Sequence, residues 1–113
     1  MNIKQILISL SLLVFVCGIY AQDVNVKYRG PVNVDNGHFV EYPLKQSSIV
    51  KAIYYDEPNE YLLVSLNGTF YHYCSIPMYV VNDWVGAPSL GGYYNAKVKG
   101  GYDCRINPTP EYR

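Results

Sequence analysis

The chain has 113 residues, which leaves room for one domain at most. Its nine basic residues balance nine acidic ones, so the formal net charge at pH 7 is zero. A nucleic-acid-binding protein usually has a strong basic excess, because neutralising phosphates supplies most of its affinity. The length therefore predicts a single domain, and the balanced charge gives no support to nucleic-acid binding.

The first 21 residues have the pattern of a secretory signal peptide. Residues 1–5 carry one lysine and no acid, residues 6–16 are almost wholly apolar, and residues 17–22 turn small and polar. The apolar stretch is shorter than the roughly 20 residues that a membrane-spanning helix needs, which argues against an uncleaved anchor. A lipoprotein needs a small residue before its modified cysteine, and Val16 fits that position poorly. We expect cleavage after Ala21, no stable membrane span afterwards, and a periplasmic or secreted protein.

Residues 22–46 are predicted to form a short N-terminal lead-in of strand and loop, wrapped on the main body. Three apolar residues alternate with polar ones, as along a strand: Val24, Val26 and Tyr28. Gly30-Pro31 then breaks the run, and Asn36-Gly37 is a tight-turn dipeptide. The segment favours one or two short strands.

The next segments predict an antiparallel meander. Residues 49–55 are rich in β-branched and aromatic residues, and a turn sequence follows at 56–59. Residues 61–66 and 69–75 flank Asn67-Gly68, the strongest short-range hairpin signal. With Thr69 this dipeptide also matches an N-glycosylation sequon, but the turn explains the same residues.

A two-residue turn fixes the register of the hairpin. It places three pairs on one side of the ribbon: Leu66 opposite Thr69, Val64 opposite Tyr71, and Leu62 opposite Tyr73. The other side holds Tyr61, Leu63, Ser65, Phe70, His72 and Cys74. The first side is the expected core face, because it carries the aliphatic residues and two tyrosines.

Two helices are predicted after the hairpin. Pro77 suits the first turn of a helix capped by Ser75 or Ile76. Its apolar stripe is Ile76, Val80, Trp84 and Ala87, and Gly86 and Pro88 end it. Ser89 can cap a second helix with the stripe Leu90, Tyr94 and Val98, which Gly100-Gly101 ends. Strands followed by helices predict an α+β fold: a three-stranded antiparallel meander, then two short helices packed on one face.

Two cysteines remain once the leader is removed. Without Lys4, eight basic residues face nine acidic ones, so the mature net charge is about −1. A mature chain of roughly 90 residues is marginally stable without help. In an oxidising compartment Cys74 and Cys104 are expected to form a disulfide, and closing a loop of about 30 residues stabilises by roughly 3–4 kcal/mol. Two free thiols, or a metal-binding or catalytic cysteine, are the alternatives.

Several motifs together resemble a known family. They are Ser47-Ser48, Ile53, Tyr55-Asp56, Leu62-x-Val64-x-Leu66-Asn67-Gly68, Tyr71-x-Tyr73, Pro77 and Ala87-x-Ser89-x-Gly91-x-Tyr93-Tyr94-Asn95-x-x-Val98. Over residues 47–105 the chain is similar to the KTSC domain, which is named for a tail on some lysyl-tRNA synthetases and also occurs as small free-standing bacterial proteins. Residues 106–113 would then be a C-terminal tail.

The resemblance implies a small α+β fold with no established enzymatic activity, and RNA binding suggested from the synthetase association. This chain differs, because it carries a signal-peptide pattern and no synthetase domain, which argues against tRNA as its target. The sequences around Cys74 and Cys104 look like an exported branch of the family in which these two cysteines pair.

Two groups of residues are candidates for binding. Tyr93, Lys97, Lys99 and Arg105 form a basic, aromatic-flanked patch that could hold a phosphate, a nucleic-acid backbone or an acidic glycan. Tyr71 and Tyr73 could stack on bases or sugars. The alternatives are an ordinary solvated face for the patch and core packing for the tyrosine pair.

The sequence gives little support to a catalytic site or a metal site. His72 and Cys74 have the spacing of a ligand pair, but a third ligand is missing because His38 lies in an irregular region. We expect no metal, no cofactor and no catalytic residue. The predicted function is a non-enzymatic exported binding domain for an unidentified protein, glycan or polyanion. An RNA-binding module is the alternative, and a small hydrolase or thiol enzyme is a third hypothesis.

Overall fold

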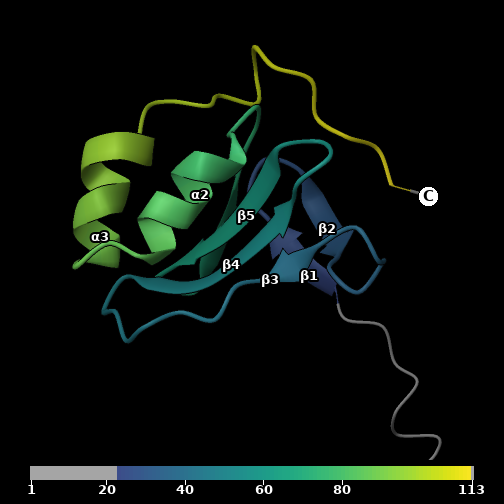
Figure 1. Cartoon of the computed structure of the whole chain (residues 1–113). Coiled ribbons are helices and arrows are strands. Elements are labelled where there is room, and N and C mark those ends of the chain that lie inside the picture. Colours follow the sequence, from purple (N-terminus) through teal and green to yellow (C-terminus); the bar gives the residue numbers. More distant parts are fainter. Residues whose placement is uncertain (1–22, 113) are drawn as a thin grey trace, which may run out of the picture.

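The computed structural model describes residues 23–112; the predicted signal peptide lies outside them. Six strands form one sheet in the order β2-β1-β6-β5-β4-β3 (Figure 1). The strands are β1 (Asp23–Val26), β2 (Gly30–Asn33), β3 (Val40–Glu41), β4 (Val50–Asp56), β5 (Tyr61–Leu66) and β6 (Thr69–Tyr73). The helical elements are α2 (Met78–Val85), α3 (Leu90–Tyr93) and the π-helical turn η1 (Tyr94–Val98).

The predicted three-stranded α+β meander is wrong, because β4, β5 and β6 are the middle of a larger, mixed and mostly β fold. Strand β1 pairs with β6 in parallel through Val26 and Phe70, and β3 pairs with β4. The segment expected to be a lead-in therefore extends the sheet at both edges. No local sequence signal predicts the pairing of β1 with β6, since a parallel pair needs a long connection rather than a tight turn.

The hairpin β5–β6 has the predicted register. Leu66 lies opposite Thr69, and Val64 lies opposite Tyr71. Asn67 and Gly68 both have positive φ, 53° and 89°, as the two-residue turn requires. The local turn chemistry thus fixes which side chains share each face of the sheet.

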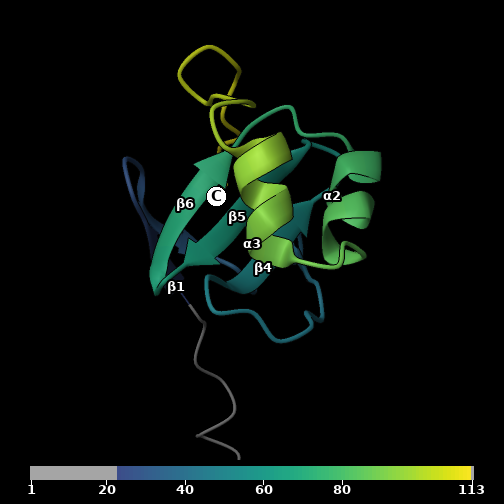
Figure 2. The same cartoon turned by 90° about the vertical axis from the view of Figure 1, so that its left-hand side faces the viewer.

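One face of the sheet is covered by α2 and α3, as Figure 2 shows. Trp84 is fully buried, and its indole N–H donates to the Leu90 carbonyl at 3.0 Å. Tyr55 is also buried and donates to the Ile76 carbonyl at 2.7 Å. The core on this side contains Val50, Ile53, Leu62, Val64, Val80, Val81 and Val98.

The N-caps of the two helices agree only in part with the predicted ones. Ser89 caps the second helix as predicted, because its hydroxyl accepts from the Gly92 N–H at 3.0 Å. The first helix has Pro77, rather than Ser75 or Ile76, at the N-cap. No helix within residues 23–112 has the length and apolar character needed to cross a membrane.

The opposite face is buried too, which the sequence did not predict. The sheet curls, so that its strands β1 and β2 pack over this face together with the C-terminal tail. The second core formed there is made of Val24, Val26, Val32, Val34, Tyr54, Tyr61, Leu63 and Cys74. Residues 61–65 of β5 are consequently buried on both sides of the sheet. The alternating valines of the lead-in are explained by this second layer.

Candidate functional site

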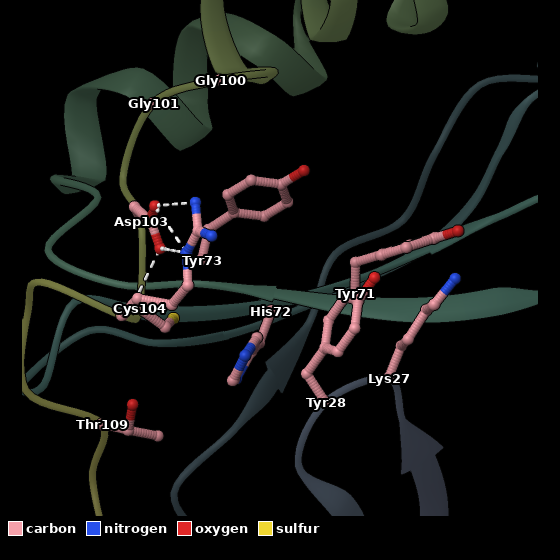
Figure 3. A pocket seen from close by; sticks show the side chains of 11 residues that line it. Lys27, Tyr28, Tyr71, His72, Tyr73, Gly100, Gly101, Asp103, Cys104 and Thr109 are labelled. Atoms are coloured by element: carbon pink, nitrogen blue, oxygen red, sulfur yellow. Dashed lines mark hydrogen bonds and ion pairs between the residues drawn. The ribbon is translucent and has the colours of Figure 1, made fainter.

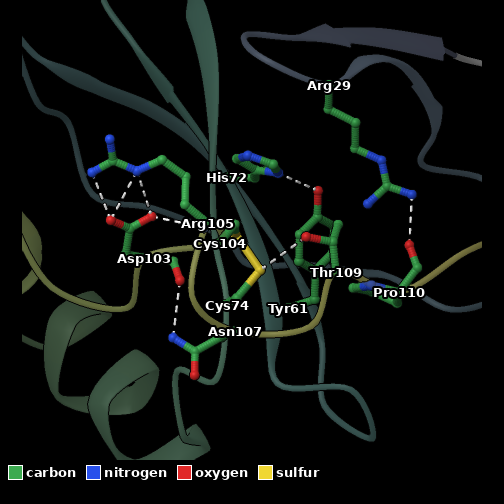
Figure 4. Close-up of a disulfide and its surroundings, with 10 residues drawn as sticks. All are labelled: Arg29, Tyr61, His72, Cys74, Asp103, Cys104, Arg105, Asn107, Thr109 and Pro110. Atoms are coloured by element: carbon green, nitrogen blue, oxygen red, sulfur yellow. Dashed lines mark hydrogen bonds and ion pairs between the residues drawn. A yellow bond between two sulfur atoms is a disulfide. The ribbon is translucent and has the colours of Figure 1, made fainter.

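A disulfide ties the C-terminal tail to the end of β6. Cys74 and Cys104 are bonded, as predicted, with their Cα atoms 4.9 Å apart (Figure 4). The Cys74 N–H also donates to the Tyr102 carbonyl at 2.8 Å. The disulfide removes the free thiolate that a metal-binding or nucleophilic cysteine needs. Within residues 23–112 no group of three His, Cys, Asp or Glu residues could hold a metal ion.

The outer edge of β6 is paired at both ends and open between them. Because the hairpin closes at Leu66 and Thr69, alternate residues of β6 turn their backbone groups away from β5. At one end the Phe70 carbonyl accepts from the Lys27 N–H at 2.8 Å, and at the other Cys74 bonds to the tail. Between them, the N–H and C=O of His72 have no partner in the described part of the chain.

A surface pocket of about 660 Å³ lies over this open edge (Figure 3). Residues 71–73 of β6 line one side of it. Lys27 and Tyr28 come from the turn directly after β1, and residues 100–101 and 103–105 come from the segment that follows the second helix. Three segments that are distant in the sequence therefore meet at one site.

The β1 side of the pocket is aromatic and cationic. The Lys27 ammonium lies 5.4 Å from the ring centroid of Tyr28 and 5.7 Å from that of Tyr71. Both distances are within the range of a cation–π contact. Tyr28 is 86% exposed and has a φ of 70°, an uncommon conformation for a residue other than glycine. Backbone outliers of this kind cluster at ligand-binding and active sites.

On the tail side, two opposite charges neutralise one another. The Arg105 guanidinium donates to both carboxylate oxygens of Asp103, at 2.7 to 3.1 Å. The bonds from the Arg105 side chain and backbone lower the pKa of Asp103 to about 2. Lys27, by contrast, has no carboxylate within salt-bridge distance among residues 23–112. The pocket therefore has one uncompensated cation.

Two polar side chains of β6, those of His72 and Tyr73, are engaged in hydrogen bonds. The Nδ1 atom of His72 lies 2.9 Å from the Tyr61 hydroxyl. Burial, and then the nearby charge of Arg29, lower the pKa of His72, so its imidazole is neutral at pH 7. The hydroxyls of Tyr73 and Tyr94 are 2.6 Å apart, and burial together with this bond raises the pKa of Tyr73.

The structure brings together only some of the residues predicted to bind. Tyr71, Tyr73 and Arg105 line the pocket. Tyr93 instead stacks on Trp84, with ring centroids 6.3 Å apart. Lys97 and Lys99 are exposed at the end of the second helix and do not line the pocket.

Sequence reasoning missed the two contributions that complete the pocket. Lys27 and Tyr28 follow an alternating segment, but only the parallel pairing of β1 places them beside Tyr71. Asp103 directly precedes Cys104 in the sequence, and its ion pair with Arg105 was not predicted. The sequence signal that could have indicated this ion pair is the separation of Asp103 and Arg105 by two residues.

Comparison with known proteins gives a family but no activity. No curated protein matches the chain. A solved structure of a KTSC domain protein from Yersinia pestis is similar to it, with a TM-score of 0.51 and 23% sequence identity, over 57% of this chain and 93% of that one. This likeness concerns the fold alone. The sequence model of the KTSC domain matches residues 46–102, half of the chain. The chain therefore belongs to the KTSC domain family.

Proposed function

We propose that this chain is a non-enzymatic binding module whose ligand site is the pocket over the open edge of β6. The observation that carries the proposal is the set of unpaired backbone groups of His72 at a pocket with an uncompensated cation and an exposed tyrosine. Concave sites with a few convergent polar groups are the usual places where proteins bind ligands.

The chemistry of the pocket favours binding over catalysis. Asp103 is held by Arg105, His72 by Tyr61, and Tyr73 by Tyr94. A general base or nucleophile needs a group that is free to reach the substrate and has a suitable pKa. The side chains here are instead fixed in place, which suits a rigid recognition surface.

We propose that the binding module works in the periplasm or outside the cell. The signal-peptide pattern of residues 1–21 and the disulfide support this, because disulfides persist in oxidising compartments. Alkylation of the protein taken from its own cells tests the location. We expect no thiol to react before reduction; reactive Cys74 and Cys104 would contradict export.

RNA or another polyanion has less support as the ligand. Arg105 is neutralised by Asp103, and Tyr93 is packed on Trp84, so the basic patch reduces to Lys97 and Lys99. The charge of the whole chain is balanced as well. The variant Lys97→Glu with Lys99→Glu therefore serves as a matched control for the pocket.

A fragment screen on the isotope-labelled full chain tests the proposed site. We expect small aromatic and amide-bearing fragments to shift the backbone signals of residues 71–73 and 100–105. Tyr28→Ala should remove these shifts, and the double lysine variant should keep them. Shifts that gather on the second helix, or that survive Tyr28→Ala and disappear with the lysines, would move the site to the basic patch. A screen without binders would contradict the proposal.

A further inference from the structure

We infer that the pocket binds an extended peptide, which adds as a short strand to β6 and pairs with the backbone of His72. The inference rests on the proposed function, since it names the ligand class of the same pocket. Strand addition supplies main-chain hydrogen bonds from an exposed sheet edge, while neighbouring pockets select the side chains.

The edge of β6 already accepts partners on both sides of His72. Lys27 bonds to Phe70 as part of a parallel strand, and Tyr102 bonds to Cys74. The free stretch between Phe70 and Cys74 spans four residue steps, or roughly 13 Å at the usual rise per residue. That length accommodates about three or four residues of an extended peptide.

The two segments that bond to Phe70 and Cys74 turn away from β6 at the two ends of this open stretch. Each turns at a tyrosine with a positive φ. Tyr28, directly after the Lys27 bond, has a φ of 70°, and Tyr102 has a φ of 55°. The disulfide holds the second segment in place through Cys104. Folded proteins usually cover or block an open edge, because it can pair with other chains. A short opening framed by two fixed turns limits what can pair there.

The side chains around the opening indicate an acidic peptide. Side chains alternate along a strand, so a residue paired with His72 places its two neighbours on the face of Tyr71 and Tyr73. The cation over Tyr71 is Lys27, which has no carboxylate partner among residues 23–112. An Asp or Glu next to the paired residue can supply that partner. Arg105 cannot serve in the same way, because Asp103 already binds it.

Selection from a random heptapeptide library against the full chain is the first test. We expect enriched peptides to carry an acidic residue beside a β-prone one. Each selected peptide is then resynthesised with a methyl group on one backbone nitrogen at a time. Methylation of the nitrogen that donates to His72 should weaken binding by about tenfold or more, since it removes a buried hydrogen bond. The other side chains remain unchanged in that comparison.

Two variants at one position separate backbone pairing from side-chain contact. His72→Ala keeps the N–H and should still bind the peptide. His72→Pro removes the outward N–H without touching a bond to β5. Proline is tolerated in a strand where the N–H faces solvent, as it does in the open stretch of β6, so the variant should fold and binding should be lost. Circular dichroism is the check that both variants fold. Lys27→Glu should change the preference of the selected peptides from acidic to basic.

The outcomes separate this inference from the proposed function. If every methylated peptide binds normally while Tyr28→Ala abolishes binding, the pocket is a ligand site but strand addition is wrong. An absence of enriched peptides also overturns the inference, and the fragment map then decides the function. Peptides that bind Tyr28→Ala and Lys27→Ala as well as the unaltered chain overturn both.

Discussion

The two faces of the sheet are covered in different ways. The helical face is covered by α2 and α3, which come from the segment 76–98 and follow β6 directly. The other face is covered by the two N-terminal strands and the C-terminal tail, from opposite ends of the described chain. The family match at residues 46–102 includes the first cover and leaves out most of the second. One layer is therefore built by local sequence, and the other by contacts between distant segments.

The second cover is held by a few polar attachments besides its valines. The Arg29 guanidinium lies 5.1 Å from the ring of Tyr61 and 5.5 Å from that of Tyr112, and it donates to the Pro110 carbonyl at 2.6 Å. Tyr112 donates to the buried carboxylate of Asp56 at 2.5 Å. Both covers bury apolar side chains, and the terminal cover is additionally attached through Arg29 and Tyr112 to the sheet and the tail.

Removing the central side chain of the helical cover should have the largest effect. Trp84→Ala deletes a fully buried indole and its bond to the Leu90 carbonyl. We expect a loss of about 3–5 kcal/mol in the free energy of unfolding, measured by urea denaturation. Tyr79→Ala on the same helix is the control, because Tyr79 is 68% exposed. Similar losses in both variants would show that the helix contributes through its backbone rather than through this core.

Removing the disulfide should have the next largest effect. Replacing Cys74 and Cys104 with alanine opens a loop with a sequence separation of 30. In the chain-entropy model the loss is about 3–4 kcal/mol. Hydrogen exchange should rise in residues 101–112 and in the N-terminal strands, while α2 keeps its protection. Uniform loss of protection would mean that the two covers unfold together, and would remove the distinction between them.

Removing the hydroxyl of Tyr112 tests how much its hydrogen bond to Asp56 stabilises the terminal cover. Tyr112→Phe keeps the ring but leaves the buried carboxylate with one partner fewer, so we expect a loss of about 1.5–3 kcal/mol. Tyr102→Phe is a matched control, because no side-chain bond of Tyr102 is present among residues 23–112. Equal stability of Tyr112→Phe and the unaltered chain would show that ring packing alone holds the tail.

The same bond predicts a loss of stability at high pH. Burial, and then the bond to Asp56, raise the pKa of Tyr112 above its ordinary value of 10.0. The neutral phenol is therefore favoured by folding, so its contribution is complete below pH 10 and declines as the pH rises toward the raised pKa. Tyr112→Phe should be less sensitive to alkali than the unaltered chain. The measurement is the urea midpoint across that range.

Local sequence signals predicted the parts of the fold that depend on neighbouring residues. Asn67-Gly68 gave the register of β5 and β6, and Ser89 gave the start of the second helix. The pairing of Val26 with Phe70 joins segments more than forty residues apart in the chain. Valine alternation indicates a strand but does not indicate its neighbour, so the order of the sheet could not be predicted.

The candidate site was predicted in part for the same reason. Tyr71, Tyr73 and Arg105 were identified from residue type, and they line the pocket. Lys27 reaches it only through the parallel pairing of β1. The unpaired backbone of His72 carries no sequence signal, because an open edge is a property of the whole sheet. The basic patch that includes Lys97 was predicted from the spacing of its residues along the second helix. Spacing does not show which residues of distant segments face one another.

The ion pair between Asp103 and Arg105 should have the smallest effect, because it is exposed. The bonds from Arg105 lower the pKa of Asp103 from 3.8 to about 2, so the pair stabilises the fold above pH 3.8 and loses its contribution as the pH falls toward 2. Carboxyl-carbon NMR of Asp103 measures this directly. In Arg105→Gln the titration midpoint should rise toward 3.8, with little change in thermal stability. A midpoint that stays low would assign the shift to the Arg105 backbone N–H, which also donates to Asp103 at 2.8 Å. In that case the tail side of the pocket is fixed by its backbone turn rather than by the guanidinium.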